Sequence, residues 1–275
     1  MKRGAWALAF LVLAAVIGAA VWFWRGRAVP PAVVSAPPPA ATVSTGQVTQ
    51  PAASAPTVVQ HPVEAPAAAP ALTAADLPAA LDELLGHKAV LSWLLTDDFA
   101  RRVVATVDNL GRSFAPSAMW PVRTTAGRFQ ASKRGGRLVV DADNAQRYTP
   151  FVLFVEGIDV ERAAALYRRI YPLLQQAWQD IGYPKGYFND RLFEVIDLLL
   201  ATPEAGDTIA LRLTEVQRPI PSTQPWLRYR FADPAFEKLS AGQKILLRMG
   251  PVNERRLKSR LAAFRLALAK LGPAR

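Results

Sequence analysis

The chain has no cysteine and only two histidines among its 275 residues. The absence of cysteine excludes disulfides, thiolate nucleophiles, cysteine-ligated zinc and iron–sulfur clusters. Neither His61 nor His87 has a second histidine at metal-ligand spacing, so we expect no metal site. The sequence also lacks a G-x-S-x-G elbow, a Walker loop and a dinucleotide-binding glycine motif. It therefore indicates no cofactor and identifies no catalytic residue.

Acidic residues are scarce relative to basic ones. The chain has 33 Lys and Arg against 22 Asp and Glu, which gives a net charge of +11. From Leu81 onward there are 29 basic and 20 acidic residues, so the C-terminal part alone carries +9. A domain of this charge attracts anionic partners, such as lipid headgroups, an anionic envelope polymer or nucleic acid. The location inferred below argues against nucleic acid.

A long apolar run occupies the N-terminus. Ala5 to Trp24 contains no charged residue, and two basic residues flank it on each side: Lys2, Arg3, Arg25 and Arg27. Twenty helical residues rise about 30 Å, which matches the hydrocarbon core of a bilayer. The run exceeds the roughly 7–15 apolar residues of a signal peptide and ends without a small-residue cleavage site. We therefore predict an uncleaved, single-pass transmembrane signal anchor over residues 1–27.

The orientation of this anchor is only weakly encoded, because the flanking Lys and Arg counts are equal. The free amino terminus adds positive charge to the short head, and a head of four residues is easily kept in the cytosol. We therefore expect the rest of the chain to lie outside the cytosol.

Residues 28–75 form a Pro/Ala-rich linker with almost no charge. A segment of this composition cannot bury enough apolar surface to offset its ordering entropy, and its prolines favour extended polyproline II. We therefore predict a disordered stalk. The alternative, a proline-rich ligand for a recognition domain, would need a basic flank that this tract lacks.

Residues 76–275 are long enough for one domain with its own core. Helical periodicity predicts a helix over Leu77–Leu85, another from Asp98 to Leu110, a helical region after Asp141 that is interrupted at Thr149-Pro150, and a long helix capped by Asp159 that continues through Pro172. Further helices follow: one opened by Asn189 or Asp190, Ala241–Met249, and Pro251 to about Leu271. Alternation predicts a hairpin with strands in 127–140, and strands over Ile209–Val216 and Trp226–Phe231. The predicted fold class is mainly α-helical α+β with a small antiparallel β-sheet.

The last predicted helix has a broad cationic face. Its apolar stripe covers a narrow arc of the helical wheel, and basic side chains cover most of the rest: Arg255, Arg256, Lys258, Arg260, Arg265 and Lys270. A solvated outer face of a docked helix explains this pattern. The alternative is an anion-binding face.

One loop combines more side-chain chemistry than an interhelix connection requires. Between Gly182 and Arg191 it carries two tyrosines, an amide, a carboxylate and a guanidinium, which makes it a candidate ligand or partner loop: Tyr183, Tyr187, Asn189, Asp190 and Arg191. In the structural alternative, the glycines allow a tight turn, Tyr187 enters the core, Asn189 or Asp190 caps the next helix, and Arg191 pairs locally.

Several long strings resemble a bacterial family catalogued as domain of unknown function 3014. They are Arg102 to Leu110 (RVVATVDNL), Trp120-Pro121-Val122, Leu166 to Thr202 and Phe231 to Pro251. The resemblance spans nearly the whole domain and implies an anchored, proline-stalked envelope protein. It implies no activity and assigns no role to any residue.

Two hypotheses for the function remain. The first is a non-enzymatic binding or scaffolding module, held at the bacterial inner membrane with its domain in the periplasm. The second is a hydrolase or transferase that acts on an envelope polymer through paired carboxylates. Its only candidates are Glu156, Asp159, Asp190 and Glu194.

Overall fold

The computed structural model describes residues 58–64, 70–206, 208–214 and 224–272, all of which belong to the unit Ser54–Arg275. The predicted anchor over residues 1–27 and the linker residues 28–57 lie outside this description. Among the residues that are described, no helix combines the length and apolar character needed to span a bilayer.

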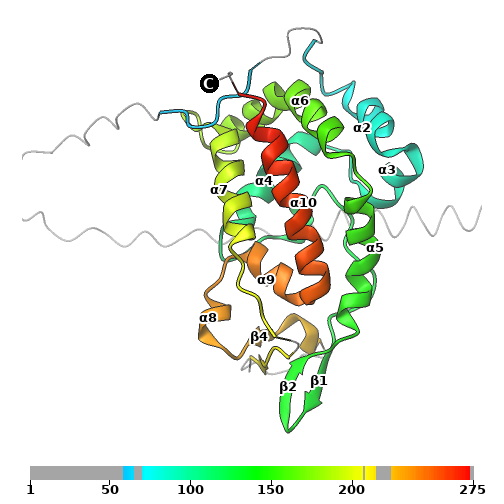
Figure 1. Cartoon of the computed structure of the whole chain (residues 1–275), viewed down its shortest axis with the longest axis vertical. Helices are drawn as coiled ribbons and strands as arrows, with labels where there is room; N and C mark the ends of the chain where they lie inside the picture. The colour runs from blue at the N-terminus through cyan, green and yellow to red at the C-terminus, as the bar shows by residue number, and fades with distance from the viewer. Residues whose placement is uncertain (1–57, 65–69, 207, 215–223, 273–275) are drawn as a thin grey trace, which may run out of the picture. The chain divides into compact units, whose positions relative to one another are not determined.

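The described unit is mainly helical, and this confirms the predicted α+β class (Figure 1). The α-helices are α2 (Leu77–Leu85), α3 (His87–Trp93), α4 (Phe99–Leu110), α5 (Asn144–Glu156), α6 (Val160–Asp180), α7 (Phe188–Leu200), α8 (Pro234–Glu237), α9 (Ala241–Arg248) and α10 (Pro251–Ala269). Two short 3₁₀ helices, η1 (Ser117–Met119) and η2 (Pro225–Leu227), lie between them.

The β-structure consists of two short antiparallel pairs. Strand β1 (Ala131–Arg134) pairs with β2 (Arg137–Val140), and β3 (Leu211–Leu213) pairs with β4 (Tyr229–Phe231). The first pair confirms the predicted hairpin. The sequence predicts its turn over Lys133–Gly136, but Lys133 and Arg134 belong to β1 and only Gly135 and Gly136 form the turn. A single bridge between Val139 and Ala210 links the two pairs.

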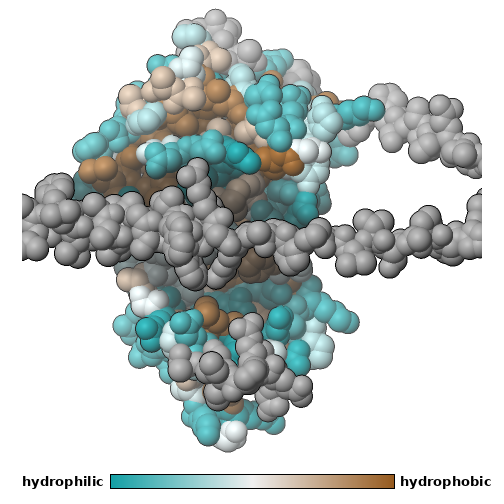
Figure 2. Space-filling model, turned by 180° about the vertical axis from the view of Figure 1, so that it is seen from behind, coloured by the Kyte–Doolittle hydropathy of each residue, from teal (hydrophilic) through white to brown (hydrophobic). Residues whose placement is uncertain are grey.

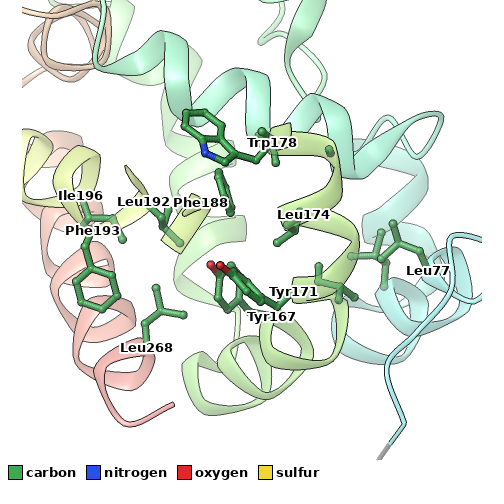
Figure 3. Close-up of a cluster of buried hydrophobic side chains, with 14 of the residues drawn as sticks. Leu77, Tyr167, Tyr171, Leu174, Trp178, Phe188, Leu192, Phe193, Ile196 and Leu268 are labelled. Atoms are coloured by element: carbon green, nitrogen blue, oxygen red, sulfur yellow. The ribbon is translucent and has the colours of Figure 1, made fainter. Parts of the chain in front are cut away.

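The main core lies between α6, α7 and the helices around them (Figure 3). Side chains of α6 and α7 point toward one another, while Leu77 of α2 and Leu268 of α10 approach from the sides. Phe188 and Leu174 are almost completely buried in this cluster. Helix α10 lies between α5 and α7 in Figure 1 and packs against α5, α6, α7 and α9.

The predicted interruption of α5 at Thr149-Pro150 is wrong, because α5 runs without a break from Asn144 to Glu156. An internal proline removes one backbone hydrogen bond and crowds the preceding turn. Packing beyond the proline offsets this cost. Val152 is fully buried, and the Phe154 ring stacks on Trp93 at 5.5 Å. Helix α6 also continues through its proline, as predicted.

One carboxyl group in the first turn of α10 is buried. Glu254 is only 3% exposed, and burial raises its pKa above the ordinary value of 4.5, although Lys258 opposes the shift from 3.5 Å. Because the pKa of Glu254 is higher in the folded state than in the unfolded state, protonation of this carboxyl group stabilises the folded protein. This stabilisation is complete below the pKa of the unfolded state and is lost as the pH rises through the pKa of the folded state.

Glu254→Gln should therefore increase the free energy of unfolding at pH 7, since the amide imitates the neutral acid. The gain should disappear near pH 3.5, where Glu254 itself is protonated in both states. Urea denaturation of both proteins at the two pH values measures the difference. An equal gain at both pH values would contradict the assignment to this carboxyl group.

Candidate functional site

The loop between α6 and α7 needs its glycines for two reasons. Gly182 has a φ of 117°, a conformation that side chains rarely adopt. A Cβ on Gly186 would lie 2.5 Å from Nε1 of Trp178, so no side chain fits there. The Tyr183 ring stacks on Trp178 with 3.8 Å between centroids.

The predicted capping of α7 by Asn189 or Asp190 is wrong. The N-cap residue is Tyr187, and α7 has no side-chain cap hydrogen bond. Asn189 is 2% exposed, and its Oδ1 accepts a hydrogen bond from the Tyr167 hydroxyl at 2.8 Å. The polar groups of Asn189 and Asp190 are instead directed at a distant part of the chain.

That distant part is Val58–Glu64, here called the docked segment, which comes from the range predicted to be linker. The Asp190 carboxylate accepts hydrogen bonds from the backbone N–H of His61 at 2.7 Å and of Gln60 at 3.1 and 3.2 Å. Asn189 Nδ2 donates to the His61 carbonyl at 2.7 Å. Two adjacent residues of α7 thus bind three backbone polar groups of Gln60 and His61, where the docked segment bends.

Further contacts hold the docked segment along α7 and at the end of α10. The Tyr187 hydroxyl accepts a hydrogen bond from Val63 N–H at 2.8 Å, and Glu64 N–H donates to the Leu271 carbonyl at 3.1 Å. The His61 ring stacks on Phe193, with 4.0 Å between centroids and 8° between planes. A cavity of about 690 Å³ lies between the segment, α7 and α10.

The remaining members of the candidate loop serve a different contact. Tyr183 donates to Asp108 Oδ2 at 3.1 Å, and Arg191 pairs with Asp108 at 3.3 Å and with Glu194 at 2.7 Å. Arg112 of the neighbouring turn completes this group by pairing with Asp108 at 2.7 Å. The five residues therefore form two sets: Tyr187, Asn189 and Asp190 hold the docked segment, and Tyr183 and Arg191 join α4 to α7.

Most of the basic residues of α10 have intramolecular partners. Four of them pair with carboxylates: Arg256 with Glu156, Lys258 with Glu254, Arg265 with Asp197, and Lys270 with Glu161. Arg260 donates to the Ile158 carbonyl. Arg255 is exposed and has no ion pair among the residues described. The anion-binding role of this face stays a prediction.

Each of the four carboxylates proposed for the enzymatic alternative has its own structural contact. Glu156 binds Arg256, Asp159 accepts the Arg162 N–H as the cap of α6 at 2.9 Å, Asp190 holds the docked segment, and Glu194 pairs with Arg191. The cap at Asp159 is as predicted. Within the described part of the chain, no cluster of three or more His, Asp or Glu side chains could hold a metal ion.

A mainly apolar cavity of about 390 Å³ lies between α5, α6, α9 and α10. Its lining includes Phe151, Leu257 and Phe264, and Arg260 is its single charged side chain.

The structure brings together a further group of residues that no sequence pattern indicated, here called the cation–aromatic cluster: Trp120, Phe129, Arg228, Phe231 and Arg248. The Arg248 guanidinium lies 4.9 Å from the Phe231 ring centroid and 6.0 Å from that of Phe129. Trp120 and Arg248 line two cavities of about 540 and 360 Å³. The strings Trp120-Pro121-Val122 and Phe231–Pro251 carried part of the family resemblance, but nothing in the sequence indicated that they meet in space.

Together, fold and contacts define a mainly helical α+β domain that binds a segment from its own N-terminal side. The chain belongs to the family described as "Protein of unknown function (DUF3014)", which matches residues 99–265. This confirms the predicted family. No curated protein and no solved structure matches the chain.

Proposed function

We propose that this chain is a bacterial inner-membrane protein whose domain is displayed in the periplasm as a non-enzymatic binding or scaffolding module. The proposal depends mainly on the hydrogen bonds that the Asp190 carboxylate accepts. Asp190 is one of the four candidate carboxylates, and it accepts hydrogen bonds from two backbone N–H groups of the docked segment. Glu194, its neighbour one turn later, pairs with Arg191. This supports a role in holding chains together over a role in cleaving them.

The docked segment also supports the tether part of the proposal. If residues 1–27 span the inner membrane, the free linker before Val58 comprises residues 28–57. In extended polyproline II at about 3.1 Å per residue, this linker reaches on the order of 90 Å. The domain would then be presented from the end where the docked segment meets α7 and α10. The partners that this charge favours are an anionic envelope polymer, lipid headgroups or another envelope protein.

Topology reporters test the location. A phosphatase fused after Arg275 should be active and a reporter that works only in the cytosol should be silent, because the predicted anchor leaves the domain outside. In a separate binding assay, full-length protein purified from the same strain should sediment with isolated envelope polymer. It should release no soluble fragments from that polymer. The reverse reporter pattern would refute the periplasmic location and restore nucleic acid as a candidate partner. Fragment release that Asp190→Asn abolishes would support the hydrolase alternative.

A further inference from the structure

The cation–aromatic cluster contains buried hydrogen-bond donors that have no acceptor. The indole Nε1–H of Trp120 and the Nε–H of Arg228 are both sealed from solvent without a partner. A buried donor without an acceptor costs about 1–3 kcal/mol, so native proteins rarely keep one without a reason. Both side chains line the cavity of about 540 Å³, and Trp120 also lines the cavity of about 360 Å³.

Arg248 is the charged centre of this region. Its guanidinium lies over the Phe231 and Phe129 rings and has neither a hydrogen bond nor an ion pair among the described residues. Burial lowers its pKa below the ordinary value of 12.5, while Glu237 and, to a lesser extent, Tyr148 oppose this shift. Two aromatic faces can hold a guanidinium in place, but they leave its N–H groups without acceptors.

Glu237 does not satisfy Arg248, because its two oxygens are already engaged. Oε2 accepts from Phe231 N–H at 3.0 Å, and Oε1 lies 2.9 Å from Arg230 and 3.7 Å from Lys244. Burial alone would raise the pKa of Glu237, yet these bonds hold it below its ordinary value. Glu237 thus joins β4 to α8 and α9 as a charged structural link.

The lining of the two cavities is strongly cationic. Glu237 is the one acidic side chain among the described residues that line the two cavities, whereas seven basic side chains line them: Arg123, Arg128, Arg147, Arg228, Arg230, Lys244 and Arg248. Arg248 lines both cavities, as do Trp120, Leu227 and Ile245. Figure 2 shows that the end of the unit carrying the β1–β2 hairpin is largely hydrophilic, whereas apolar residues gather in the opposite half of that face.

We propose that the two cavities form one binding site for an oxyanion, a phosphate or carboxylate group, on a ligand whose remainder packs against Trp120 and Leu227. Arg248 donates to the oxyanion, while Trp120 and Arg228 belong to the wall of the site, since their orphaned N–H groups are closed off from solvent. Arginine is suited to this role because its planar fork matches two oxygens of one phosphate or carboxylate group. This site would give the proposed binding module a class of ligand. It rests on the proposed function only in that the ligand would come from the cell envelope.

Fluorine NMR of full-length protein labelled with 5-fluorotryptophan tests the site. The chain has seven tryptophans, and Trp120→Phe and Trp226→Phe assign the two resonances at the cavities. Inorganic phosphate or citrate should shift the Trp120 resonance saturably, while chloride at equal ionic strength should not. The Trp178 resonance, from a ring stacked on Tyr183 in the core, reports that the protein stays folded.

Arg248→Gln should weaken the binding of phosphate or citrate at least tenfold. Arg255→Gln removes the same charge from an exposed position outside both cavities and should change the affinity less than twofold. The proposal is overturned if neither anion shifts Trp120 in the unmodified protein, or if Arg248→Gln binds as tightly as Arg255→Gln with Trp178 unchanged.

Vesicles identify the source of the oxyanion. A Trp120 shift with phosphatidylglycerol vesicles, absent with phosphatidylcholine, indicates a lipid headgroup, whereas a shift with soluble envelope polymer alone indicates the polymer. Both outcomes support the site. Because these titrations are done in vitro, they are independent of the topology reporters: a cytosolic domain would refute the proposed location and leave the oxyanion site standing.

Discussion

Replacing Phe188 with alanine should lower the free energy of unfolding by about 3–5 kcal/mol. The Phe188 ring is fully buried where α7 begins, 5.9 Å from the Trp178 ring, and its removal leaves a void among side chains that cannot collapse into it. Urea denaturation followed by circular dichroism measures the loss. As a control, Leu91→Ala removes a side chain that is 61% exposed and should change stability by less than about 1 kcal/mol. Equal effects of the two substitutions would contradict the assigned core.

Asp190→Ala should release the docked segment from the domain. The substitution removes the acceptor for the N–H groups of Gln60 and His61, so hydrogen exchange at these two amides should accelerate more than tenfold. The exchange of core amides in α6 should stay unchanged, because Asp190 caps no helix and contributes little to the packing of α7. Exchange measured by mass spectrometry on peptides covering residues 58–64 and α6 gives both values.

Glu194→Ala is the matched control for this experiment. Glu194 is also an acidic residue of α7, one turn after Asp190, but it pairs with Arg191 and does not contact the docked segment. Its substitution should leave exchange at Gln60 and His61 unchanged. If exchange at Gln60 and His61 is no faster in Asp190→Ala than in Glu194→Ala, the segment is held by something other than the carboxylate.

Local signals in the sequence predicted those parts of the fold whose causes lie within a few residues. Asp159 caps α6 through Arg162 N–H, three residues later, and the Gly135-Gly136 turn connects strands that are adjacent in the chain. The same reasoning failed at Asn189 and Asp190. Both have the side chains of capping residues, but the partners of Asp190 lie 129 and 130 residues away and those of Asn189 lie 22 and 128 residues away. Such competing contacts cannot be seen in a local pattern.

The cationic helix α10 illustrates a second limit. The helical wheel of α10 predicted a face that is either solvated or binds a ligand. A helical wheel shows where charged side chains lie on one helix, but it does not show which residues of other helices lie beside them. Arg256 and Arg265 instead meet Glu156 and Asp197 from α5 and α7, which surround α10. Arg248, on a helix whose sequence showed nothing unusual, has neither a hydrogen bond nor an ion pair within the part of the chain that the structure describes. Composition predicted an affinity for anions, but only the fold distinguishes neutralised cations from a cation that still lacks a partner.

The docked segment also determines how the domain would respond to mechanical load. A pull on the chain from its N-terminal side reaches Val58–Glu64 before it reaches α2. The segment is held by a few backbone hydrogen bonds and one stacked ring, which can be broken one after another as the chain is peeled away. The segment would therefore detach first and open the surface formed by Tyr187, Asn189 and Phe193, while the helical core stays intact. A modest force on the N-terminal side would in this way be relieved before it could unfold the domain.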